Sequence, residues 1–282
     1  HFDTAALYGA GTNESPVGEV LGPRRDEYFL ARKCGMTAID GRRGIDGRPE
    51  TLKATCEEGL RRLRTDHIDL YYLHRWDRSI PVEESVGALA ELVAEGKIGG
   101  IGLSEVSAAT LRRAHAVHPI AALQTEYSLW TRNPELGTLQ ACRDLGTAFV
   151  AFSPLGRGFL AGAVRDMAAL PASDIRHAMP RFSAENHPRN AALLDGLGAL
   201  AREGGCTMAQ LALAWVLDRG EHVIALPGTT SIEHLDEDLG AGSARLDAGL
   251  LGRMDALINE QTVHGPRYSP ALQADVDTEV FA

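Results

Sequence analysis

The chain has 282 residues, of which 44% are hydrophobic and 23% charged, and this composition is typical of a folded globular protein. Its formal net charge of −10 argues against a nucleic-acid-binding protein, which would need a basic face. No apolar run approaches the roughly 18 residues of a membrane-spanning helix, and no segment resembles a signal peptide. We therefore expect a cytoplasmic protein without a metal site, whose four scattered cysteines are reduced.

Short apolar runs alternate with longer amphipathic ones, which is typical of repeated βα units and a parallel sheet. Seven runs are predicted as strands: His1–Ala5, Tyr28–Arg32, Ile68–Leu73, Ile98–Leu103, Ala122–Glu126, Ala148–Phe152 and His222–Leu226. Five stretches are predicted as helices: Pro49–Leu63, Pro81–Glu95, Ala108–His115, Pro134–Leu145 and Met208–Arg219. These units predict an α/β fold, a single domain over residues 1–282 built as a TIM-like (β/α)8 barrel that lacks its first βα unit. An open doubly wound sheet is the alternative.

Two long stretches, Leu155–Pro188 and the tail after Gln261, are predicted to be irregular loops. Loops of that length in a compact domain usually have a function, often covering a site.

In parallel α/β folds the functional groups gather at the carboxyl ends of the strands. The polar residues at or just beyond the predicted strand ends are Asp3, Tyr8, Lys33, His74, Ser104 and Gln124. Each has an ordinary structural explanation when taken singly, such as a turn cap for Asp3 or a hydrogen-bonded core residue for His74.

The rarity of lysine in this sequence favours a functional role for one of these residues. Only three basic residues are lysine, namely Lys33, Lys53 and Lys97, and all the others are arginine. Lysine shifts its pKa readily in an apolar site, whereas arginine stays charged. Because Lys33 follows an apolar run, it is a candidate for chemistry.

Together, Asp3, Tyr8, Lys33 and His74 fit a proton-transfer site. A phenol has an ordinary pKa of about 10 and is a poor acid at neutral pH. A neighbouring ammonium group stabilises the phenolate, and a carboxylate paired with that ammonium holds it charged and in place. An imidazole can orient a carbonyl group by donating a hydrogen bond. The four residues predict a site that protonates a carbonyl oxygen as a hydride reaches its carbon.

These residues lie within segments that resemble one family over nearly the whole chain. The segments are HFDTAALYGAGTNE, LARKCG, IDLYYLHRWD, IGLSE, LQTEYSLWTR, AFSPLGRGFLAG and ALPGTT. Their order and spacing resemble those of the aldo-keto reductases, in particular a bacterial branch with a PRF segment (Pro180 to Phe182) and an RY segment (Arg267 and Tyr268).

The resemblance implies a (β/α)8 barrel that binds NADPH without a Rossmann fingerprint and reduces a small-molecule aldehyde or ketone. It also implies that Tyr8 is the general acid, Lys33 and Asp3 its tuning pair, and His74 the group that orients the carbonyl. The substrate pocket would be lined by Trp76 and Trp130, although aromatic packing under a loop explains these two residues equally well.

The resemblance also implies where the dinucleotide would bind. Ser104 and Gln124 would hold the nicotinamide carboxamide, and Phe152 would stack on its ring. The full set of implied cofactor residues is Ser104, Gln124, Phe152, Ser153, Leu155, Gly156, Gly158, Pro227, Gly228, Thr229, His234, Glu237 and Asp238.

The sequence departs from the family at three places that carry weight. One of them is Glu105, which follows Ser104 where many relatives have asparagine. The family has a further strand and helix before the HFDTA segment, and a barrel without them would leave sheet edges that favour a homo-oligomer. Relatives often carry arginine where this chain has His234 and asparagine where it has Asp238. Histidine cannot imitate the fork that arginine offers to the 2′-phosphate of NADPH. We therefore expect a weakened preference for NADPH, with NADH as an alternative.

Two hypotheses for the function follow. The intact set of Asp3, Tyr8, Lys33 and His74 favours an NAD(P)H-dependent carbonyl reductase. The departures from the family pattern favour an impaired or non-catalytic cofactor-binding or interaction protein on the same scaffold. The enzyme is the leading hypothesis.

Overall fold

The computed structural model describes residues 1–39 and 42–281. The chain forms two compact units, each assembled from three separate stretches. The first unit consists of His1–Gln124, Gly137–Ala148 and Asp275–Thr278. The second consists of Thr125–Leu136, Phe149–Ala274 and Glu279–Ala282. Across the described residues, no helix combines the length and the apolarity that crossing a bilayer requires.

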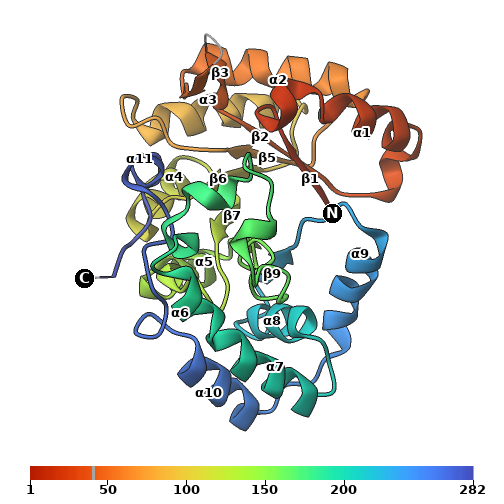
Figure 1. The fold of residues 1–282 in the computed structure, drawn as a ribbon. Coiled ribbons are helices and arrows are strands. Elements are labelled where there is room, and N and C mark those ends of the chain that lie inside the picture. Colours follow the sequence, from red (N-terminus) through yellow and green to blue (C-terminus); the bar gives the residue numbers. More distant parts are fainter. Residues whose placement is uncertain (40–41, 282) are drawn as a thin grey trace. The chain divides into compact units, whose positions relative to one another are not determined.

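A parallel sheet forms the centre of the first unit. Its strands, in spatial order, are β1 (Phe2–Ala5), β2 (Leu30–Cys34), β5 (Leu70–Leu73), β6 (Ile101–Ser104) and β7 (Ile120–Glu126), the last of which belongs to this unit through Gln124. Spatial order follows chain order, as Figure 1 shows, because each strand pairs with the next strand of this sheet along the chain. All the carboxyl ends of these strands therefore meet at one edge of the sheet.

Helices follow the strands of the first unit in regular alternation. They are α1 (Glu14–Leu21), α2 (Pro49–Leu63), α3 (Val82–Ala94), α4 (Ala108–Val117) and α5 (Thr138–Leu145). Each of these helices packs against the next in chain order. A hairpin of two antiparallel strands, β3 (Met36–Ile39) and β4 (Arg42–Ile45), follows β2 and was not predicted.

Helix α2 confirms the predicted span Pro49–Leu63. Proline suits the first turn of a helix, since its missing N–H would have no partner there. Apolar side chains recur every three or four residues on one face and are buried: Leu52, Cys56, Leu60 and Leu63. The helix ends at Arg64, whose left-handed backbone (φ 54°) lets the chain turn.

Several predicted boundaries differ from the observed ones by one to four residues, and two of these differences have an identifiable cause. The predicted helix Pro134–Leu145 is interrupted at Gly137, so a 3₁₀ turn over Asn133–Leu136 precedes α5. The second strand was predicted over Tyr28–Arg32, but the pairing of Asp3 with Ala31 moves β2 two residues along the chain. Lys33 therefore lies within the strand and its side chain is fixed by the sheet.

The second unit contains the parallel pair β8 (Ala148–Phe152, in this unit from Phe149) and β9 (Val223–Leu226). Its helices are α6 (His187–Ala191), α7 (Leu193–Glu203), α8 (Met208–Leu217), α9 (Ile232–Leu239), α10 (Ala248–Leu257) and α11 (Pro270–Gln273). Helix α8 is buried along most of its length and starts with a capping box between Thr207 and Gln210.

The long stretch that was predicted to be irregular carries only short 3₁₀ turns before α6. These turns are Met167–Ala169, Ile175–Ala178 and Pro180–Phe182.

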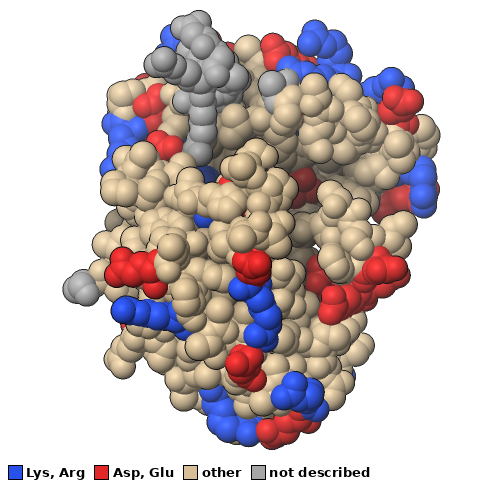
Figure 2. Space-filling model, viewed as in Figure 1, with Lys and Arg blue, Asp and Glu red and all other residues tan. Residues whose placement is uncertain are grey.

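On the face drawn in Figure 2, acidic and basic side chains are interspersed rather than gathered by sign.

Candidate active site

A buried ion pair joins the first two strands of the sheet. Lys33 on β2 donates a hydrogen bond to the carboxylate of Asp3 on β1. The exposed fraction of the side chain is 1% for Lys33 and 6% for Asp3. A buried ammonium group needs such a partner, because water no longer solvates it. The pair therefore holds a positive charge at the carboxyl edge of the sheet.

The phenol of Tyr8 lies over this ion pair. Tyr8 begins a 3₁₀ turn (Tyr8–Gly11) that directly follows β1. Its hydroxyl oxygen is 3.4 Å from the Nζ atom of Lys33, and its ring centroid is 5.1 Å from the same atom. The side chain is 40% exposed, so the hydroxyl can meet both a ligand and water. A phenol that contacts a buried cation is suited to giving up a proton.

His74 faces Tyr8 from the end of β5. Their ring centroids are 6.1 Å apart, and the rings are nearly perpendicular. The backbone N–H of His74 donates to the carbonyl oxygen of Cys34 at 2.9 Å, which fixes the residue to the end of β2. Tyr8 and His74 thus present two polar groups side by side.

Two further predicted residues, Gln124 and Ser104, belong to the same cluster. Gln124 donates from its Nε2 atom to the second carboxylate oxygen of Asp3 at 3.0 Å. It pairs across the sheet with Ser104 at the end of β6. Both side chains are buried, and the amide of Gln124 contacts the ion pair directly.

Arg75 is a residue of this cluster that the sequence analysis missed. Its Nη1 atom donates to the carbonyl oxygen of His74 at 2.6 Å and to the Oγ atom of Ser104 at 3.1 Å. The side chain is 9% exposed. It follows His74 directly, so a charged residue next to a predicted site residue at a strand end was the signal that could have found it.

The turn after β8 carries several of the predicted cofactor residues of the second unit. Ser153, Gly156, Arg157 and Gly158 all have positive φ. A Cβ atom at Gly156 would lie 2.9 Å from the Trp130 ring, so glycine is required at that position. Arg157 is held by a bidentate ion pair with the buried carboxylate of Glu126. The turn is therefore tightly defined.

The remaining cofactor candidates of the second unit lie at the end of β9 and on α9. Gly228, Thr229 and His234 are exposed, while Glu237 is half-buried. Asp238 is buried, and burial together with the charge of Glu237 raises the pKa of its carboxyl group. Phe152, Ser153 and Leu155 after β8 and Pro227 after β9 are half-buried.

The two predicted pocket tryptophans differ in their surroundings. Trp76, in the first unit, donates from Nε1 to the carbonyl oxygen of Ile80 at 2.8 Å and is half-buried. Trp130, in the second unit, is 4% exposed and stacks on Phe159 with ring centroids 3.9 Å apart. Trp130 is thus also part of an aromatic core.

The described part of the chain holds no cluster of three or more histidine, cysteine, aspartate or glutamate side chains suited to a metal ion.

A family model described as "Aldo/keto reductase family" matches residues 1–259. The chain belongs to this family. A probable aldo-keto reductase 1 from Glycine max is 45% identical over 277 residues, which cover 96% of this chain and 79% of the relative. The aldo/keto reductase assignment supports an oxidoreductase.

Two solved aldo/keto reductase structures share the fold. The glycerol dehydrogenase from Gluconobacter oxydans matches with a TM-score of 0.84 and 29% identity, covering 95% of this chain and 83% of that one. A thermostable aldo-keto reductase, solved with the inhibitor epalrestat, matches with a TM-score of 0.73 and 30% identity, covering 91% and 81%. These similarities confirm the predicted α/β fold of the TIM-like (β/α)8 class.

Proposed function

We propose that this chain reduces the carbonyl group of a small aldehyde or ketone to an alcohol with NADPH, and that Tyr8 is the general acid. The observation that carries this proposal is the line of contacts from Asp3 through Lys33 to the Tyr8 hydroxyl. An exposed phenol, a buried cation and a buried carboxylate are arranged in that order. This arrangement suits the transfer of a proton to an oxygen on which negative charge develops.

The residues present in each unit fit a nicotinamide dinucleotide. In the first unit, Ser104 and Gln124 offer a hydroxyl and an amide, which match the donors and acceptors of a carboxamide. The second unit by itself carries Phe152, an aromatic ring suited to stacking on a nicotinamide, and the turn from Ser153 to Gly158, which is suited to phosphates. The segment from Pro227 to Asp238 would take the adenosine end. When bound, the cofactor supplies the hydride.

The side chains of the first unit would then do the acid chemistry. His74 would donate a hydrogen bond to the carbonyl oxygen and orient it beside the Tyr8 hydroxyl. As negative charge develops on the carbonyl oxygen, the Tyr8 O–H bond would break and its proton would form the new O–H bond of the alcohol. Lys33 stabilises the phenolate that remains, and Asp3 holds Lys33 in place. Water can return the proton, because Tyr8 is 40% exposed.

The distance between Tyr8 and Lys33 is longer than a charge-assisted hydrogen bond usually is. It measures 3.4 Å, against roughly 2.7–2.9 Å for such bonds. Catalytic hydrogen bonds are often long without substrate and shorten when it binds. We expect the contact to tighten as negative charge develops on the phenol oxygen.

The experiment that tests the proposal is the turnover of 4-nitrobenzaldehyde by Tyr8→Phe, followed through the loss of NADPH absorbance. We expect kcat to fall roughly 100- to 10,000-fold, which is the usual contribution of a positioned acid. Tyr28→Phe is the matched control, because Tyr28 is an aromatic residue that packs on Phe2 outside the cluster. Equal activity of Tyr8→Phe and the unmodified chain would overturn the role of Tyr8.

A fluorescence titration with NADPH separates the enzyme from the non-catalytic alternative. Saturable binding with turnover supports the reductase. Saturable binding without turnover of any aldehyde or ketone tested would favour a cofactor-binding protein that has lost the reaction.

A further inference from the structure

A pocket of about 230 Å³ lies within the second unit, and none of the residues that take part in the proposed reaction lines it. It lies between the segment that contains Trp130 and the chain after Asn259. Its wall combines arginine side chains, among them Arg132 and Arg181, with the apolar side chains of Val263 and Phe281. A wall of this composition is suited to a ligand with one charged end and an apolar body.

Arg181 is held rigidly at this pocket by groups that carry no charge. Its Nη1 atom donates to the carbonyl oxygen of Trp130 and, at 2.9 Å, to the Oγ1 atom of Thr131. Its Nε atom donates to the carbonyl oxygen of Gly265 at 3.1 Å. Its Nη2 atom makes no hydrogen bond to any described residue, which leaves a fixed donor for a ligand.

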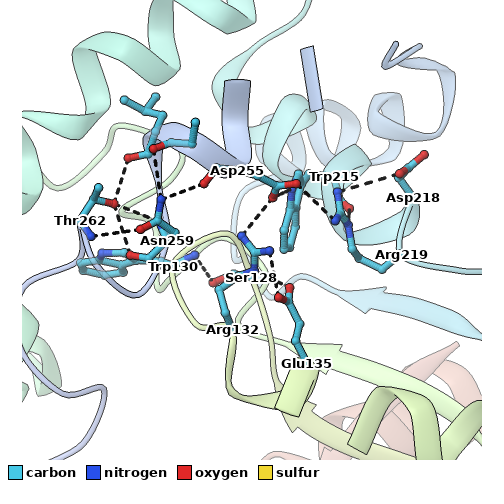
Figure 3. A network of polar contacts seen from close by, with 12 residues as sticks. Ser128, Trp130, Arg132, Glu135, Trp215, Asp218, Arg219, Asp255, Asn259 and Thr262 are labelled. Carbon is cyan, nitrogen blue, oxygen red and sulfur yellow. Dashed lines mark hydrogen bonds and ion pairs between the residues drawn. The ribbon is translucent and has the colours of Figure 1, made fainter. Parts of the chain in front are cut away.

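The charge of Arg181 has no ion-pair partner, unlike those of its neighbours. Arg132, on the same wall, contacts the carboxylates of Glu135 and Asp255, as Figure 3 shows. Arg157 is paired with Glu126. Within residues 1–39 and 42–281, no carboxylate lies within ion-pair distance of Arg181.

The electrostatic surroundings of Arg181 agree with an unbalanced charge. Burial, together with the neighbouring guanidinium groups of Arg267 and Arg157, outweighs the charge of Glu126 and lowers the pKa of Arg181 to about 10. The group still carries its proton at neutral pH, so an anion that bound beside it would relieve the cost of the buried charge.

A second polar group at the pocket also lacks a partner. The Nε1 atom of Trp130 is buried and makes no hydrogen bond within the part of the chain that the structure describes. The Trp130 ring lies 5.2 Å from the guanidinium carbon of Arg181. A tryptophan N–H normally finds an acceptor when it is buried. The pocket wall therefore includes a tryptophan whose N–H has no acceptor among the described residues, beside an arginine whose Nη2 atom makes no hydrogen bond to them.

We propose that this pocket binds a small monocarboxylate with an apolar or aromatic body. The carboxylate would accept from the Nη2 atom of Arg181, and the body would pack against Trp130, Val263 and Phe281. The volume admits only a small molecule, since ordinary ligand pockets are roughly 300–1,000 Å³. The exposed carboxylate of Glu260 on the pocket wall would disfavour ligands with several negative charges.

Calorimetric titration of the full chain with benzoate tests the proposal, with benzamide as the neutral molecule of the same shape. We expect benzoate to bind saturably and benzamide to bind at least tenfold more weakly. Equal affinity for the two, or no binding of benzoate, would overturn the proposal. Because binding is measured without NADPH or an aldehyde, the result is independent of the proposed reduction.

Three variants locate the benzoate site. Arg181→Met should abolish benzoate binding, whereas Arg253→Met, which removes a surface partner of Glu203, should leave it unchanged. Arg181 also supports the backbone, so Val263→Phe provides a second test that fills the pocket and leaves every arginine in place. Unchanged benzoate affinity in a folded Val263→Phe protein would overturn the proposed location.

Discussion

The ammonium group of Lys33 donates to the carboxylate of Asp3 between two neighbouring strands, and water reaches almost none of either side chain. In this position a single positive charge serves both the stability of the sheet edge and the chemistry proposed for Tyr8. The two roles can be separated by experiment.

Lys33→Met should destabilise the fold as well as stop the reaction. The Asp3 carboxylate would stay buried without its cation, and breaking one half of a buried pair costs about 3–5 kcal/mol. The double variant Asp3→Asn/Lys33→Met removes both charges and should recover most of the free energy of unfolding in urea without recovering turnover. A single variant as stable as the unmodified protein would contradict the buried ion pair.

Arg75→Met should weaken NADPH binding more than it slows turnover. Arg75 donates to the Ser104 hydroxyl and to the His74 carbonyl oxygen, so it positions the group that would hold the carboxamide. We expect KM for NADPH to rise about tenfold or more, because one hydrogen bond to a charged group contributes about 1.5–3 kcal/mol. Arg24→Met, on the surface, is the control. A fall in kcat with unchanged KM would argue against this role.

Asp277→Ala should loosen the start of α4. The Asp277 carboxylate accepts from the backbone N–H and the hydroxyl of Ser107 and from the hydroxyl of Thr110, at 3.3, 3.0 and 2.6 Å. Losing these bonds should cost about 1–3 kcal/mol. Amide hydrogen exchange should accelerate over residues 107–111 and stay unchanged in α2. The exposed Asp26→Ala variant is the control, and equal exchange in both variants would exclude the contact as a stabilising one.

Glu126 should make stability depend on acid pH. Burial alone would raise the pKa of its carboxyl group, but Arg157 and Arg267 outweigh burial and lower the pKa from 4.5 to about 2. Because the folded-state pKa lies below the unfolded one, the stabilisation is complete above about pH 5 and is lost as the pH falls toward 2. When unfolding by urea is measured across this range, the free energy of unfolding should fall less between about pH 5 and pH 3 for Glu126→Gln than for the unmodified protein. Parallel pH curves for the two proteins would contradict the prediction.

His234→Arg should increase the preference for NADPH. His234 is exposed on α9, and a guanidinium group there could form a forked contact with the 2′-phosphate. We expect KM for NADPH to fall about tenfold and KM for NADH to stay the same. His118→Arg adds the same charge elsewhere and is the control for long-range attraction. A similar fall in KM for NADPH and in KM for NADH would show that residue 234 does not contact the 2′-phosphate.

Much of the fold follows from local signals in the sequence. Pro49 and the spaced apolar residues of α2 define that helix, because capping and one-sided burial both act within the segment. The same holds for Thr207 and the start of α8. The ends of the strands were also predicted accurately enough to identify one group of candidate residues, namely Asp3, Tyr8, Lys33 and His74.

Other elements depend on contacts that a local pattern does not reveal. Helix α1 was not among the predicted helices, and it contains Pro16 and Gly18, two residues that are common in turns. A Cβ atom at Gly18 would lie 2.4 Å from the Arg62 carbonyl oxygen, so glycine allows α1 to pack closely on α2. Glu14 is buried there against Arg32 and Arg62. Arg75 follows His74 directly, but its role was missed because it rests on a contact with Ser104, 29 positions away.

The scarcity of lysine has a practical consequence for handling this protein. Amine-reactive dyes and supports need an accessible side chain, and that of Lys33 is 1% exposed, whereas those of Lys53 and Lys97 are 38% and 33% exposed. Apart from the amino terminus, coupling would therefore attach a label or a surface at two outward-facing positions. The amine beside Tyr8 would be spared.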